Sequence, residues 1–104
     1  MSESPVIFEK PKVVPREKVA EPSMYSVILH NDSMTPRGFV VIALKQCFNK
    51  VEREANTIMQ EAHEEGSAVV ATFSREIAEV KAAKGNDFSA KHGQVLLFTA
   101  EKQN

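Results

Sequence analysis

The sequence predicts an α+β fold, in which a three-stranded antiparallel sheet carries three helices on one face. Three short runs of apolar and β-branched residues occur at 24–31, 67–73 and 95–101, and such runs are typical of strands. Between them, apolar residues recur at steps of three and four, which indicates amphipathic helices. The expected order is therefore β-α-α-β-α-β, a layered arrangement with helices packed against a small sheet.

The first helix is expected to follow the strand at 24–31 after a short polar turn. Thr35 and Pro36 predict its start, because a hydroxyl suits the N-cap and proline suits the first helical position. The residues expected to face inward are Phe39, Val40, Ala43, Leu44, Cys47 and Phe48.

A second helix is expected to begin after Asn49, with Glu52 in the capping-box position. Gly66 is the expected left-handed stop. The apolar stripe of this helix consists of Val51, Ala55, Ile58, Met59 and Ala62.

The third helix is expected to lie between the strands at 67–73 and 95–101. Ser74 is its expected cap, and Gly85 with Asn86 is expected to weaken or interrupt it before Gly93 ends it. Its inner face is predicted to carry Ile77, Val80 and Phe88.

Residues 1–22 differ from the rest of the chain. They contain four of the five prolines, their charges balance, and no helical or strand periodicity is present. Proline removes backbone donors and blocks helix formation, so a flexible N-terminal extension is expected before a single core domain at 23–104. The plain alternative is a leader remnant with no role.

Composition excludes several classes of protein. With 104 residues and a formal net charge of −1, the chain suits one domain and lacks the basic excess of a nucleic-acid binder. No apolar run approaches the roughly 18–20 residues of a membrane helix, and the first residues do not form a secretory signal. Because Cys47 is the only cysteine, a disulfide framework is excluded and a reducing compartment is indicated. A cytoplasmic monomer is expected, without nucleic-acid or membrane partners.

A polar corner after the first strand is the main candidate site. Asn31 and Asp32 stand at this corner, and His63 follows Met59 by four residues, along one edge of the second helix. If the two helices pack together, these three polar side chains converge beside an apolar surface made by Val40, Met59 and Ala62. A primary ammonium has three donors, and the three side chains offer three acceptors. The alternatives are an ordinary turn and a surface histidine near a helix end.

Several segments in the same order resemble the ClpS family, whose members are adaptors that deliver substrates to a bacterial AAA+ Clp protease. The resemblance covers Pro22 to Lys102, and its segments are "PSMYSVILHND", "TPRGFVV", "VEREANTIMQEAHEEGSAVV", "EIAEVKA" and "LLFTAEK".

The resemblance implies a non-enzymatic function without a cofactor, metal or catalytic residue. ClpS proteins bind N-degrons, which are substrates whose first residue is Leu, Phe, Tyr or Trp. By this resemblance Asn31, Asp32 and His63 hold the free α-amino group. Glu76 and Lys81 match the positions that dock on the N-terminal domain of a ClpA-like unfoldase, and the extension matches the arm that engages the unfoldase during delivery. The side chain of the first residue would enter a pocket formed by Thr35, Arg37, Val40, Met59, Ala62 and Leu96.

The sequence departs from the family pattern around this pocket. Ser33 replaces a second Asp, and Arg37 replaces the methionine at the pocket mouth. Gly38 in the first helical turn costs roughly 1 kcal/mol relative to Ala. Gln94 and Val95 stand where the family often has a proline. Our hypothesis is that Arg37 alters or narrows the preference among the four first residues.

Three alternative functions remain. The chain could be a regulator that docks on the Clp unfoldase and competes with another adaptor without binding N-degrons efficiently. A cysteine enzyme using Cys47 and His63 is disfavoured, because Cys47 falls on an apolar helix face. A metal site from His30, Asp32, His63 and His92 is also disfavoured, because the spacing matches no zinc motif.

Overall fold

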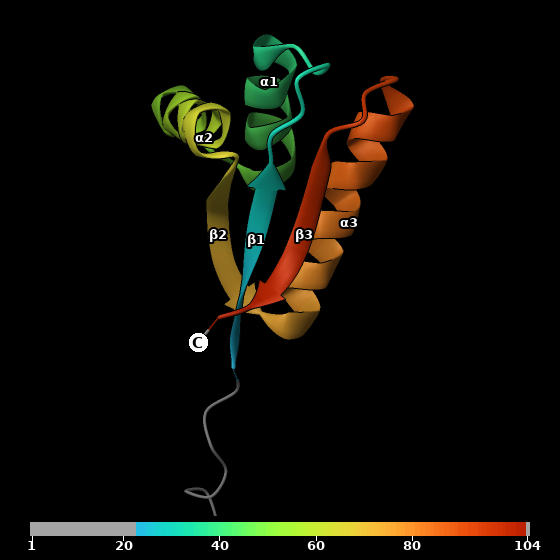
Figure 1. Ribbon diagram of the computed structural model, residues 1–104. Helices are drawn as coiled ribbons and strands as arrows, with labels where there is room; N and C mark the ends of the chain where they lie inside the picture. The colour runs from blue at the N-terminus through green and yellow to red at the C-terminus, as the bar shows by residue number, and fades with distance from the viewer. Residues whose placement is uncertain (1–22, 104) are drawn as a thin grey trace, which may run out of the picture.

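The computed structural model describes residues 23–103 and has the predicted order of strands and helices (Figure 1). The expected extension at 1–22 lies outside the described residues. The elements are β1 (Met24–His30), α1 (Arg37–Phe48), α2 (Glu52–Glu65), β2 (Ser67–Ser74), α3 (Arg75–Lys91) and β3 (Leu97–Lys102). The last strand begins two residues later than the sequence indicated.

The sheet has the strand order β2-β1-β3, and both strand pairs are antiparallel. Strand β1 is therefore central, with Leu29 opposite Ala68 on one side and Phe98 on the other. Alternate side chains of β1 point toward the helices, and Val27 and Leu29 are fully buried there. The polar corner begins directly after β1 ends at His30.

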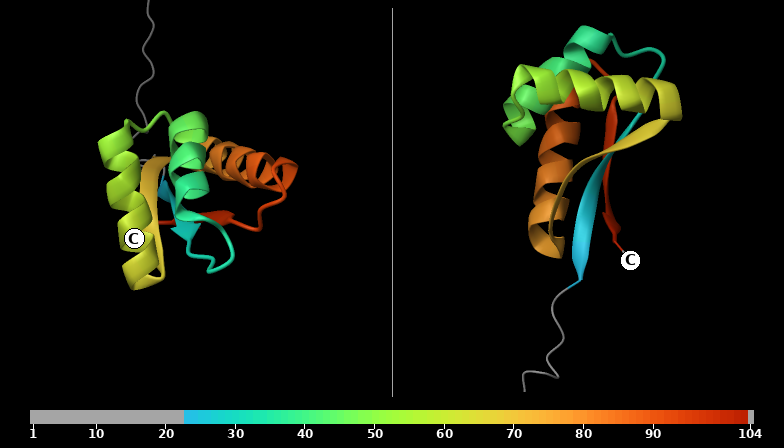
Figure 2. Two further views of the ribbon diagram at one scale, coloured as in Figure 1. Left: turned by 90° about the horizontal axis from the view of Figure 1, so that it is seen from above. Right: turned by 90° about the vertical axis from the view of Figure 1, so that its left-hand side faces the viewer.

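The helices occupy two positions relative to the sheet. Figure 2 shows α3 alongside one face, while α1 and α2 lie together at the end of the sheet where β1 ends and β2 begins. Leu44 of α1 and Phe98 of β3 are among the largest fully buried side chains, so the core is continuous between these layers. The predicted α+β fold is confirmed.

The caps of α1 and α2 differ from the sequence prediction. Thr35 does not cap α1, because its hydroxyl donates to Oδ2 of Asp32 at 2.7 Å and Pro36 occupies the N-cap position. Asn49 does not cap α2 but ends α1 in the left-handed region, with a φ of 55°. Glu52 accepts instead from Lys45 of α1 at 2.8 Å. The left-handed stop at Gly66 is confirmed by its φ of 95°.

The α2 stripe and the α3 cap are confirmed only in part. Val51 is 62 % exposed, so it does not belong to the buried stripe of α2. Ala55 and Ala62 are buried, and Ile58 and Met59 pack against the core from half-buried positions. Ser74 occupies the N-cap position of α3 but makes no capping hydrogen bond through its side chain.

The buried face of α3 is also different from the prediction. Ile77 and Val80 are 49 % and 66 % exposed, so they do not face the sheet. Phe88 is half-buried and stacks on Phe39 of α1, with ring centroids 5.6 Å apart. The side of α3 that is buried consists of small residues, namely Ala78, Ala82, Gly85 and Ser89.

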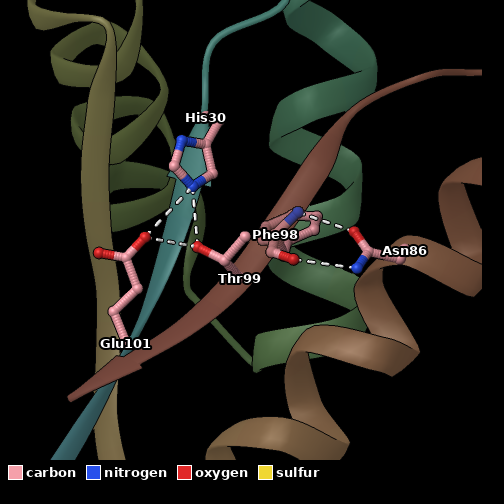
Figure 3. Close-up of polar contacts among 5 residues, drawn as sticks. All are labelled: His30, Asn86, Phe98, Thr99 and Glu101. Carbon is pink, nitrogen blue, oxygen red and sulfur yellow. Dashed lines mark hydrogen bonds and ion pairs between the residues drawn. The ribbon is translucent and has the colours of Figure 1, made fainter.

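Gly85 and Asn86 do not interrupt α3, because both serve the contact with β3. A Cβ on Gly85 would lie 2.6 Å from Cδ2 of Phe98, so only glycine permits this approach. The Asn86 amide donates to the carbonyl of Phe98 at 2.9 Å and accepts from its backbone N–H at 2.7 Å (Figure 3). These contacts compensate for the low helix propensity of both residues.

Candidate functional site

The polar corner after β1 is held by three hydrogen bonds. The backbone N–H of Asn31 donates to the carbonyl of Gly66 at 2.9 Å, which ties the corner to the start of β2. The N–H of Thr35 donates to the carbonyl of Asp32 at 3.2 Å and closes a turn. The buried Thr35 hydroxyl also donates to Oδ2 of Asp32. The other carboxylate oxygen of Asp32 makes none of these bonds, so it can accept from a ligand.

A pocket of about 360 Å³ opens beside this corner, between β1, α1, α2 and the residue before β3. Its volume falls at the lower end of the roughly 300–1,000 Å³ range for ligand sites, which suits one side chain better than a long peptide. The lining residues are Leu29, Asn31, Asp32, Ser33, Thr35, Pro36, Arg37, Val40, Met59, Ala62, His63 and Leu96.

The structure places all nine amine-binding and pocket candidates from the sequence in this lining. Three further residues were missed, which are Leu29, Ser33 and Pro36. The sequence contained a signal for Leu29. Alternate residues of a strand face the same side, and Leu29 precedes the predicted site residue Asn31 by two positions. Ser33 and Pro36 flank predicted site residues and line the pocket through their position in the turn.

The pocket has an apolar interior and a polar mouth. Leu29, Val40 and Leu96 are between 0 % and 8 % exposed and form part of the interior. Asn31 and His63 are exposed, and Asp32 is half-buried. The arrangement can therefore bind a group with an apolar end and a charged donor end, such as an amine attached to a hydrophobic side chain.

Arg37 and His63 meet across the pocket mouth. Nη2 of Arg37 in α1 forms a hydrogen bond with Nε2 of His63 in α2. A guanidinium has donors and no acceptor, so Nε2 accepts and the proton of the neutral ring lies on Nδ1. The sequence placed both residues near the pocket without predicting this contact.

A second polar cluster lies on β1 and β3, outside the pocket lining (Figure 3). Nε2 of His30 is 2.8 Å from the hydroxyl of Thr99 and 3.7 Å from a carboxylate oxygen of Glu101. His92 lies apart from both the pocket and this cluster. It follows the last residue of α3, and its Nδ1 donates to the carbonyl of Phe88 at 2.8 Å. Of the four residues of the metal alternative, only Asp32 and His63 share the pocket, and His30 and His92 lie apart from them. Within 23–103, no group of three or more His, Cys, Asp or Glu could hold a metal ion.

Cys47 is unsuited to nucleophilic chemistry. Its side chain is buried between α1 and α3, and it does not line the pocket that contains His63. Burial raises the pKa of the thiol, although nearby Lys84 and Lys81 oppose this effect. The thiol form is therefore favoured at neutral pH, in contrast to the activated thiolate of a cysteine enzyme.

The two candidate docking residues lie on α3, away from the pocket lining. Glu76 is exposed in the first turn of α3. Lys81 is half-buried, and its ammonium lies 6.0 Å from the ring centroid of Phe73 in β2. Among the described residues, no helix is long and apolar enough to cross a membrane.

Comparison with known proteins gives a consistent result. Residues 20–99 match the family model described as ATP-dependent Clp protease adaptor protein ClpS. The chain is 44% identical over 104 residues to the Clp protease adapter protein ClpS 2 of Agrobacterium fabrum, covering 99% of each chain. It is 44% identical over 94 residues to ClpS 1 of Bradyrhizobium diazoefficiens, covering 90% of this chain and 93% of that relative. The solved structure of Agrobacterium tumefaciens ClpS2 bound to L-phenylalaninamide is 42% identical, with a TM-score of 0.78, and covers 80% of this chain and 100% of that one.

Proposed function

Because the chain belongs to the ClpS family of ATP-dependent Clp protease adaptor proteins, we propose that it binds N-degrons and delivers them to a AAA+ Clp protease. In this function the protein binds the substrate and the protease and catalyses no reaction itself. The observation that carries this proposal is the pocket beside Asn31 and Asp32, which combines an apolar interior with acceptors at its mouth. The ligand is the first residue of a substrate protein, Leu, Phe, Tyr or Trp, with a free α-amino group.

The α-amino group binds at the pocket mouth. Its three donors pair with the amide oxygen of Asn31, the carboxylate oxygen of Asp32 that Thr35 leaves free, and Nε2 of His63. Each hydrogen bond to a charged group contributes about 1.5–3 kcal/mol before the cost of ordering the ligand. Acetylation removes the charge and most of the donors, so an acetylated N-terminus does not bind.

The side chain of the first residue enters the interior of the pocket. Burial of one Leu or Phe side chain contributes about 1.5–3 kcal/mol, which is comparable to one of the amine contacts. A relative of known structure was solved with L-phenylalaninamide, a molecule that has a phenyl side chain and a free α-amino group. Its 42% identity to this chain supports the same class of ligand here. Arg37 at the mouth alters or narrows the preference among the four residues.

Delivery uses a different part of the molecule. Glu76 and Lys81 on α3 dock on the N-terminal domain of a ClpA-like unfoldase, and the segment 1–22 engages the unfoldase during transfer. The adaptor works as a monomer in the cytoplasm. Because neither docking residue lines the pocket, protease and substrate can be bound at the same time.

A second candidate is favoured by the contact between Arg37 and His63, which occupies an acceptor at the pocket mouth. In that case the protein docks on the unfoldase and competes with another adaptor without efficient N-degron binding. Fluorescence anisotropy with labelled peptides beginning with Leu, Phe, Tyr, Trp or Ala tests both candidates. Micromolar binding to a bulky subset, abolished by acetylation, supports the adaptor. Equal or absent binding of all the peptides supports the regulator.

A further inference from the structure

The hydrogen bond between Arg37 and His63 uses the acceptor that His63 could offer to a ligand. A neutral imidazole has one nitrogen with a lone pair, and in this structure that nitrogen, Nε2, faces the guanidinium of Arg37. The other ring nitrogen carries the proton and can only donate. His63 therefore has no free acceptor while Arg37 is in place.

An α-ammonium group also has donors and no acceptor, so it needs the same lone pair. We propose that Arg37 is an intramolecular competitor of the substrate's α-amino group, which must displace the guanidinium from His63 to bind fully. This inference rests on the proposed function, since it assumes that the pocket mouth binds an amine. It makes Arg37 a determinant of affinity for every ligand with a free α-amino group, in addition to its proposed effect on the preference among first residues.

The contact is suited to reversible displacement. Both side chains are exposed, so water can replace the hydrogen bond when the guanidinium moves away. Exposed interactions of this kind are weak, and breaking one lowers the affinity for a ligand by about three- to ten-fold. Such a cost reduces binding without abolishing it.

A double-mutant cycle tests the proposal on the full chain. L-phenylalaninamide and L-leucinamide are titrated calorimetrically into the wild type, Arg37→Met, His63→Ala and the double variant. Arg37→Met is expected to tighten binding of both amides by about five-fold, because no side chain then competes for the lone pair of His63. In the His63→Ala background the same substitution is expected to change the affinity less than two-fold, since the shared acceptor is gone.

Arg53→Met is the matched control. Arg53 is an exposed residue of α2 outside the pocket lining, and its substitution changes the net charge by the same amount. It is expected to leave both affinities unchanged. A gain from Arg37→Met that is equal in both His63 backgrounds would overturn the proposal, because Arg37 would then act only through its charge or bulk. No gain in the wild-type background would also overturn it.

A measurement without ligand separates this proposal from the function on which it rests. Nitrogen-15 NMR of the imidazole should show the proton of His63 on Nδ1 in the wild type and a shifted tautomer balance in Arg37→Met. An identical tautomer balance in both proteins overturns the competition even if the amides bind. If the NMR difference is present but neither amide binds any variant, the proposed amine site fails and the competition for an amine fails with it.

Discussion

Gly85 of α3 lies directly against the ring of Phe98 in β3, and no side chain could be added between them. A Cβ at position 85 would lie 2.6 Å from one ring carbon and 2.9 Å from another. Phe98 is itself only 1 % exposed, so its ring cannot move into solvent. The distance between α3 and the sheet thus depends on a residue that was expected to weaken the helix.

Gly85→Ala is expected to lower the free energy of unfolding. Forcing a methyl group into this contact costs about 1–3 kcal/mol, which exceeds the roughly 0.5–1 kcal/mol gained from better helix propensity. Urea denaturation followed by circular dichroism measures the difference. Gly38→Ala is the control, because a Cβ at position 38 meets nothing within 4 Å and that variant should be slightly more stable. A stabilised Gly85→Ala variant would show that the contact is looser than the structure indicates.

Arg37→Met is expected to change the ranking of peptides beginning with Leu, Phe, Tyr and Trp. The guanidinium lines the pocket mouth, and an unbranched apolar side chain there presents a different surface to the entering residue. The four dissociation constants of each protein, measured under one buffer condition, give the ranking. If the order of all four is the same in both proteins, Arg37 does not determine side-chain selectivity.

Glu76→Ala and Lys81→Ala are each expected to weaken docking on the unfoldase and to leave peptide affinity unchanged. Both positions lie on α3, outside the pocket lining. Surface plasmon resonance with the immobilised N-terminal domain of a ClpA-like unfoldase measures the first quantity, and anisotropy the second. Lys91→Ala, at the other end of α3, is the control and should affect neither. Loss of peptide binding in either docking variant would contradict the assignment of two separate surfaces.

The thiol of Cys47 is expected to react slowly with iodoacetamide in the native protein at pH 8. Burial restricts access and raises the pKa of the thiol, so little thiolate is present at that pH. The rate of alkylation should increase at least about tenfold in urea, where the thiol is exposed and the ordinary pKa of a cysteine is about 8.5. Fast native alkylation would place Cys47 in a mobile or open part of the structure.

Some of this structure could be predicted from hydrophobic patterning, because apolar runs and helical periodicity are local. The same reasoning failed for the inner face of α3. Ala78, Gly85 and Ser89 are buried there because small residues let the helix pack closely, and Ile77 is exposed. Hydropathy has no signal for a helix that approaches a sheet closely. The prediction that Thr35 caps α1 was wrong because its hydroxyl pairs with Asp32, a choice between two local partners that the pattern does not decide.

The site was predictable to a similar extent. Two signals indicated which residues surround the pocket. One was the polar side chains of Asn31, Asp32 and His63, and the other was the resemblance to ClpS proteins. The contact of Arg37 with His63 could not be predicted, because it joins residues 26 positions apart through the packing of two helices. Such a contact depends on side-chain geometry, which periodicity does not contain.

The pair of hydrogen bonds between Asn86 and the backbone of Phe98 also limits how far the sheet can extend. β3 is an edge strand, and an unpaired edge is a template on which a strand of another molecule can add. Phe98 pairs with Leu29 on the side of β1, and its N–H and carbonyl are both occupied by the Asn86 amide. One side chain of α3 thus takes the place of a fourth strand, and at this position the edge is closed to intermolecular β-pairing and the aggregation that can follow from it.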